Sequence, residues 1–156
     1  MLYSLESSIL SKLNDYFANK KDVEDRLTIE TYMGEFEDPS KIEDMLNKPL
    51  IFLDFVNESY QDIATKKVDF KIYVCSRCST KEKNKRIENK YVAIKLIEKI
   101  DKVLIDELFS YGFEANLTNL SKTYERVSEQ GYISLYTRDF SVLIKTTNEG
   151  EGIEII

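Results

Sequence analysis

Hydrophobic and polar residues alternate strictly over one segment in the middle of the chain. Val68, Phe70, Ile72 and Val74 alternate with Lys67, Asp69, Lys71 and Tyr73. This period of two predicts a strand with one face in a core and one in water, within a sheet that we expect to be antiparallel. Farther along, apolar residues recur at helical steps: Tyr91, Ile94, Ile97, Ile100, Leu104 and Leu108. They predict an amphipathic helix over 91–108 that covers the sheet.

The first third of the chain predicts two helices and two strands. A helical stripe with Ser4 as its N-cap consists of Leu5, Ile9, Leu13, Tyr16 and Phe17. Alternation over 27–33 predicts a half-buried strand. Residues 38–46 predict a short helix, because an aspartate can cap it and a proline fits its first turn. The nearly all-apolar run 50–56 predicts a central strand covered on both faces.

The last third predicts a hairpin and a long final strand. Residues 123–128 and 132–136 favour strands, and Gln130-Gly131 predicts a tight reversal between them. The alternation continues through 140–144, which extends the second strand. We therefore expect one domain over 1–147 and an acidic C-terminal tail over 148–156. The order of elements predicts an α+β fold, with a mainly antiparallel sheet and two longer helices packed on one face.

Charge divides the chain into a basic and an acidic segment. Residues 77–90 hold six lysines and arginines against two glutamates, a balance of +4, although the whole chain carries −6. Residues 22–44 hold nine carboxylates against two cations, a balance of −7. Opposite charges in one chain predict head-to-tail contacts between copies, which can close into a ring. A solvated acidic face and an exposed basic loop are the plainer interpretations.

The basic segment supplies the candidate interface residues. We expect contacts to another subunit or to DNA in a channel at Arg77, Lys81, Lys83, Lys85, Arg86 and Lys90. Like charges repel along 79–89, so we expect these residues to be mobile in the free subunit. A sequence pI near 4.9 argues against general affinity for nucleic acid or anionic lipid, so any DNA contact must be local.

Residues that could carry chemistry are few. Histidine is absent, which removes the usual general base and the commonest metal ligand. Cys75-Ser76-Arg77-Cys78 has the spacing of a thioredoxin-type redox pair. A basic, turn-forming run follows this pair and no proline lies downstream, so two reduced structural cysteines are the favoured interpretation. Two cysteines alone do not complete a zinc site. We expect no catalytic, cofactor or metal site.

Several segments together resemble one family of phage proteins. They are the helix 5–13, the strands 48–55 and 70–77, the helix 91–108, the segment 127–132 and Phe140. In these apolar patterns, from about Leu5 to Ile144, the chain is similar to the tail-terminator-like proteins of Mu-type phages and prophages. The resemblance implies an α+β subunit that assembles into a homo-oligomeric ring, with a hexamer as one candidate size. Such a ring caps the tail tube protein and joins it to a neck or head-completion protein.

Two other functions stay open at this point. The chain could be another neck or tail-completion adaptor whose basic segment contacts non-specific DNA in the tail channel, or a thiol-disulfide protein that uses Cys75 and Cys78. The N-terminus lacks the basic and apolar regions of a signal peptide, and no stretch has the length of a transmembrane helix. We therefore expect no membrane partner, and a location in the host cytoplasm during assembly and then in the virion tail.

Overall fold

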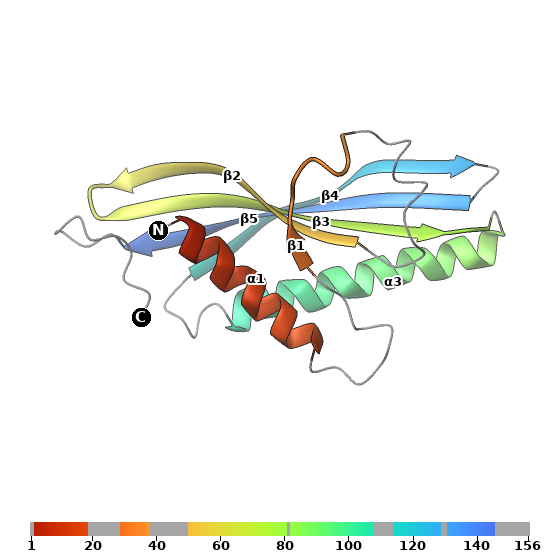
Figure 1. Cartoon of the computed structure of the whole chain (residues 1–156), viewed down its shortest axis with the longest axis horizontal. Helices are drawn as coiled ribbons and strands as arrows, with labels where there is room; N and C mark the ends of the chain where they lie inside the picture. Colours follow the sequence, from red (N-terminus) through yellow and green to blue (C-terminus); the bar gives the residue numbers. More distant parts are fainter. Residues whose placement is uncertain are drawn as a thin grey trace.

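The fold consists of one long sheet with helices beside it (Figure 1). The computed structural model describes residues 2–18, 29–37, 50–80, 82–107, 114–128 and 131–145. Along the chain these form α1 (Leu2–Ala18), β1 (Ile29–Thr31), β2 (Leu50–Asp62), β3 (Thr65–Cys78), α3 (Lys83–Lys102), the π-helical turn η2 (Val103–Glu107), β4 (Glu114–Ser128) and β5 (Gly131–Lys145). The predicted short helix over 38–46 and the predicted tail over 148–156 lie outside the described residues.

The sheet has the strand order β1-β2-β3-β5-β4. β1 runs parallel to β2, and every other neighbouring pair is antiparallel. This confirms the predicted α+β class and the mainly antiparallel sheet. The predicted hairpin is also confirmed, since Ser128 of β4 pairs with Gly131 of β5. The continuation of the final strand is confirmed, because β5 runs without a break to Lys145.

The main core combines one face of the sheet with residues from α1 and α3. The predicted stripe of the first helix is confirmed, since Leu5, Ile9, Leu13 and Phe17 are fully buried. From the sheet, the same core contains Ile51, Leu53, Val68, Phe70, Ile72, Val74, Tyr136, Phe140, Val142 and Ile144. Phe70 and Phe140 stack with their ring centroids 5.4 Å apart. These two rings join the inner strands β3 and β5 at the centre of the core.

The opposite face of the sheet carries a smaller aromatic cluster. Tyr32 and Phe36, in the turn after β1, contact Phe52 of β2 and Tyr73 of β3. Tyr32 and Phe36 also stack with their centroids 5.7 Å apart. We call this side, which faces away from the main core, the open face.

Three sequence expectations about element positions are wrong. Ser4 does not cap the first helix, because α1 already begins at Leu2. The run 50–56 does not form the central strand; β3 is central, and the second half of β2 is mostly exposed. The helix predicted over 91–108 begins at Lys83 instead, and Tyr91 is 57% exposed. Its buried stripe is rotated to Ala93, Leu96, Ile97, Ile100, Val103 and Leu104.

Candidate assembly surface

The basic segment lies where β3 ends and α3 begins, at one end of the sheet (Figure 1). Arg77 is the penultimate residue of β3. The first turns of α3 carry Lys83, Lys85, Arg86 and Lys90. Lys81 lies outside the described residues. The expected loop over 79–89 is therefore wrong from Lys83 onward. The physical reason is that lysine, arginine and glutamate are good helix formers, and their propensity outweighs the repulsion between like charges.

The charges at the start of α3 oppose the dipole of their own helix. The N-terminus of a helix carries a partial positive charge, so cations there are unfavourable. No acidic residue lies in the first turn, and the N-cap residue Glu82 makes no side-chain capping bond. The ion pair between Lys85 Nζ and Glu88 Oε2 spans 3.5 Å, but both side chains are more than half exposed, so it contributes little. The positive charges in the first turn therefore do not stabilise the helix, although the helix propensity of the same residues does.

Hydrogen bonds of Asn89 attach the first turns of α3 to the sheet. Ser76 Oγ donates to Asn89 Oδ1 at 2.8 Å, and Asn89 Nδ2 donates to the carbonyl oxygen of Arg77 at 2.9 Å. Ser76 is fully buried. One side-chain amide thus binds the second turn of α3 to the end of β3. This contact was not predictable from the sequence, because a polar residue within a charged run carries no distinctive signal.

A second polar contact fastens the other half of α3. Arg138 on β5 binds Asp101 with two hydrogen bonds, from Nε to Oδ1 at 2.9 Å and from Nη2 to Oδ2 at 2.6 Å. Both side chains are less than one fifth exposed. This bidentate geometry is the strong form of an arginine–carboxylate pair. It orients α3 on the sheet. The basic residues Lys83, Lys85, Arg86 and Lys90, which we call the basic start of α3, therefore have a defined position.

The two cysteines are too far apart to form a disulfide with each other. β3 is extended through Cys75 to Cys78, so their side chains point to opposite faces. Three residues of strand separate their Cα atoms by about 10 Å, beyond the reach of a disulfide. Burial raises the pKa of the Cys75 thiol to about 12, although nearby Arg77 lowers it in part. Cys75 packs on the face of the sheet opposite to Val74, and Cys78 is the last residue of β3.

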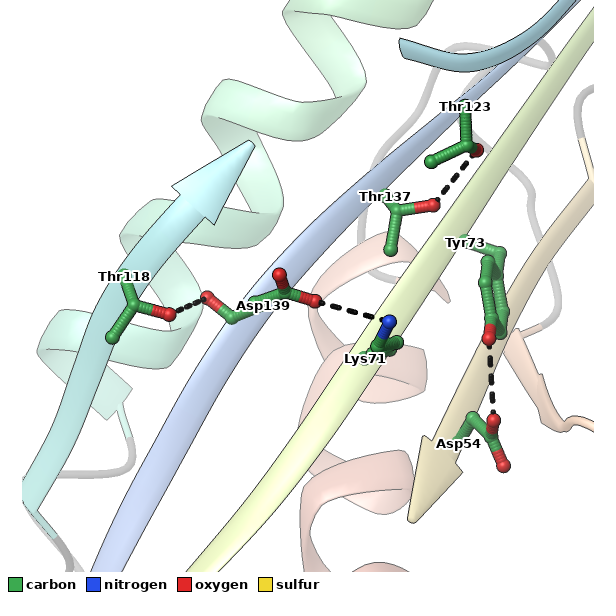
Figure 2. Close-up of polar contacts among 7 residues, drawn as sticks. All are labelled: Asp54, Lys71, Tyr73, Thr118, Thr123, Thr137 and Asp139. Atoms are coloured by element: carbon green, nitrogen blue, oxygen red, sulfur yellow. Dashed lines mark hydrogen bonds and ion pairs between the residues drawn. The ribbon is translucent and has the colours of Figure 1, made fainter. Parts of the chain in front are cut away.

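The centre of the open face carries a row of polar side chains from four strands (Figure 2). Lys71 Nζ lies 3.9 Å from Asp139 Oδ1, and the Tyr73 hydroxyl donates to Asp54 Oδ2 at 3.3 Å. Burial raises the pKa of Asp54, and burial together with the Asp54 charge raises the pKa of Tyr73 to about 12. The tyrosine therefore stays protonated at neutral pH. Such a hydroxyl is a poor base or nucleophile, so the row fits a structural role better than a catalytic one.

The last findings concern metal binding, membrane-spanning helices and similarity to known proteins. Among the described residues, no group of three or more cysteines and carboxylates is arranged to hold a metal ion. No helix in the described ranges is long and apolar enough to cross a membrane. No protein-family model matches the chain, and no curated protein matches it either.

Proposed function

We propose that this chain is a structural phage or prophage tail protein that assembles into a ring, in the role of a tail terminator. The observation that carries the proposal is the basic start of α3. Three cations, Lys83, Lys85 and Arg86, lie in the first turn of α3, where their charges oppose the helix dipole, and Asn89 anchors that helix to the sheet. Residues that oppose local stability are typical of sites that serve another purpose. An acidic partner surface would compensate these charges.

A second copy of the chain can supply that surface. Residues 22–44 carry a balance of −7, and only part of this segment is described, with Glu30, Glu35 and Glu37 in it. Contact between the basic start of one copy and the acidic segment of the next is heterologous, and such contacts close into a ring when the rotation allows it. In the proposed role this ring caps the tail tube, contacts the neck and surrounds the DNA. The subunit is made in the host cytoplasm and ends in the virion tail.

The direct test is the mass of the protein in solution. Native mass spectrometry and light scattering should show a closed oligomer at low ionic strength, with less of it as salt rises. Exposed charge pairs are screened within about 8 Å at physiological ionic strength, which is the reason for the salt effect. A monomer at every protein and salt concentration would contradict the proposal.

A matched pair of charge reversals tests whether the basic start itself drives assembly. Lys83→Glu with Lys85→Glu reverses two exposed charges at the start of α3, and Lys95→Glu with Lys102→Glu reverses two exposed charges farther along the same helix. Both variants change the net charge equally. We expect the first to assemble at least ten times more weakly and the second to assemble like the original chain. Equal weakening would show that only net charge matters.

The adaptor alternative rests on the same residues and gives a different result. If the basic start contacts DNA and not a second copy, Lys83→Glu with Lys85→Glu should abolish a gel shift of duplex DNA and leave the oligomer intact. Cations on phosphates also predict that this binding weakens steeply with salt. That outcome would replace the terminator role with the adaptor role.

A further inference from the structure

The outer edge of the short strand β1 is covered by the helix α1. Asn14 of α1 binds the backbone of Ile29 in β1 through both amide atoms, at 3.0 Å from Nδ2 to the carbonyl oxygen and 2.8 Å from the backbone nitrogen to Oδ1. Thr31 Oγ1 also donates to Glu6 of α1. The helix thereby satisfies the outer backbone groups of Ile29 and covers the edge of this short strand.

Two longer edges have no such cover among the described residues. β1 pairs with β2 only from Ile51 to Leu53, so the outer edge of β2 is unpaired from Asp54 to Asp62. No described strand pairs with the outer edge of β4 along its whole length, from Glu114 to Ser128. An uncovered edge presents a row of backbone donors and acceptors, which is a template for another strand.

The directions of these two edge strands allow antiparallel pairing between copies. β2 is antiparallel to β3, β3 to β5, and β5 to β4, so β2 and β4 run in opposite directions. If copies are related by a rotation about an axis along the strands, β4 of one copy lies antiparallel to β2 of the next. The alternation within each sheet then continues from copy to copy without a reversal.

The side chains and bulges of the two edges also match. Large exposed apolar side chains occur on both edge strands, at Val56, Tyr60, Leu120 and Val127, and the inner strands β3 and β5 have none. Each edge strand contains two bulges, next to Phe55 and Tyr60 in β2 and next to Leu117 and Lys122 in β4. Bulges bend a strand and break its ladder into short segments, which disfavours indiscriminate pairing and leaves few usable registers.

We propose that the ring forms by strand pairing, with β4 of one copy added antiparallel to the Asp54–Asp62 part of β2 in the next. This inference rests on the proposed function and adds a second contact between copies, beside the one between the basic start of α3 and the acidic segment 22–44. The partner is therefore a second copy of this chain, and the sheets of successive copies form one continuous, mainly antiparallel sheet around the ring.

The register of the sheet indicates which residues to join. Asn57 of β2 lies opposite Asp69, which lies opposite Ser141, which lies opposite Asn116 of β4. Asn57 and Asn116 are thus at the same level on the two edges, and both are exposed. Strands in closed sheets tilt, which shifts the contact along β4. Asn119 is the next exposed residue of β4 on the same face.

The experiment uses disulfide formation between copies. In a Cys78→Ser background we compare Asn57→Cys with Asn116→Cys, and Asn57→Cys with Asn119→Cys, under mild oxidation. Cysteines on adjacent strands lie within disulfide reach, so one double variant should give a ladder of covalent trimers and larger species on a non-reducing gel. Each single-cysteine variant should stop at the dimer. Cys75 is buried and should stay unreactive.

Two measurements keep this inference separate from the proposed function. If native mass spectrometry shows a ring but neither double variant gives species above the dimer, strand pairing is overturned and the ring proposal stands. If the original chain is a monomer under all conditions, both are overturned. A ladder whose largest covalent species equals the native oligomer supports both and counts the copies.

Discussion

The inner and the edge strands of this sheet are built differently. β3 and β5 pair over fourteen consecutive positions, from Thr65 with Lys145 to Cys78 with Tyr132, and no register shift interrupts them. β2 and β4 each pair with an inner neighbour through two register shifts. β5 buries both of its faces over much of its length, and β3 buries one face and half-buries the other, whereas most of β4 is exposed. The uninterrupted pairing of β3 with β5 thus specifies the fold. The interrupted and more exposed edge strands are available for contacts with other molecules.

The largest expected difference between these regions concerns core packing. Phe70→Ala should lower the free energy of unfolding by about 3–5 kcal/mol, because it removes a buried ring stacked on Phe140 and leaves a cavity. Tyr60→Ala on the edge strand β2 should lower it by about 1 kcal/mol or less, since Tyr60 is 63% exposed and its ring lies 5.1 Å from Lys66 Nζ. Urea unfolding followed by circular dichroism measures both. A similar loss in the two variants would remove the distinction.

Two ion pairs, one shielded and one on the open face, should show a similar difference with smaller changes in the free energy of unfolding. Arg138→Leu leaves the shielded Asp101 carboxylate without its two hydrogen bonds, so we expect a loss of about 2–3 kcal/mol. Lys71→Met breaks the 3.9 Å pair with Asp139 on the open face and should cost about 1 kcal/mol or less. Asp101→Asn with Arg138→Leu tests the reason, since it should recover part of the first loss. If the double variant is no more stable than Arg138→Leu, the unpaired charge is not the cause.

The cysteines give the next smaller effect. Cys75→Ser places a hydroxyl in a buried apolar position and should cost about 1–2 kcal/mol, whereas Cys78→Ser should cost less than about 0.5 kcal/mol. Cys78 should react with a thiol reagent in the folded protein and Cys75 only after unfolding. Burial raises the Cys75 pKa from 9.0 to about 12, so folding stability should fall as pH rises between these values. Fast labelling of both thiols would contradict this assignment.

Local patterns in the sequence identified much of the fold. Alternation along Val68–Val74 located the strand that proves central, and the stripe from Leu5 to Phe17 located α1, because burial on one face imposes these periods. Periodicity could not place β3 beside β5, since strand order depends on contacts between residues distant in the sequence. The same limit hid the Arg138–Asp101 pair, whose members are 37 positions apart.

The candidate site was only partly predictable. Its basic residues are visible in the sequence, but their conformation was predicted wrongly for Lys83–Lys90, because charge repulsion was given more weight than helix propensity. The anchor between Asn89 and Ser76 depends on the angle at which α3 meets β3, and no local pattern encodes that angle. The open edges likewise follow only from the strand order.

A substitution beside a bulge of β4 should have the smallest effect on the free energy of unfolding and should test most directly whether this edge takes part in assembly. Thr118 Oγ1 donates to the carbonyl oxygen of Asp139 at 3.2 Å, beside a register shift (Figure 2). Thr118→Val keeps the shape and removes this bond, so the free energy of unfolding should fall by only about 0.5–1 kcal/mol. If β4 is the joining edge, the same change should loosen the strand and weaken assembly more than it weakens folding. Lys71→Met is the control, because it breaks a contact of similar expected cost between the two inner strands, from Lys71 of β3 to Asp139 of β5. Equal effects of the two variants on assembly, measured by light scattering, would show that the edge of β4 has no special part in it.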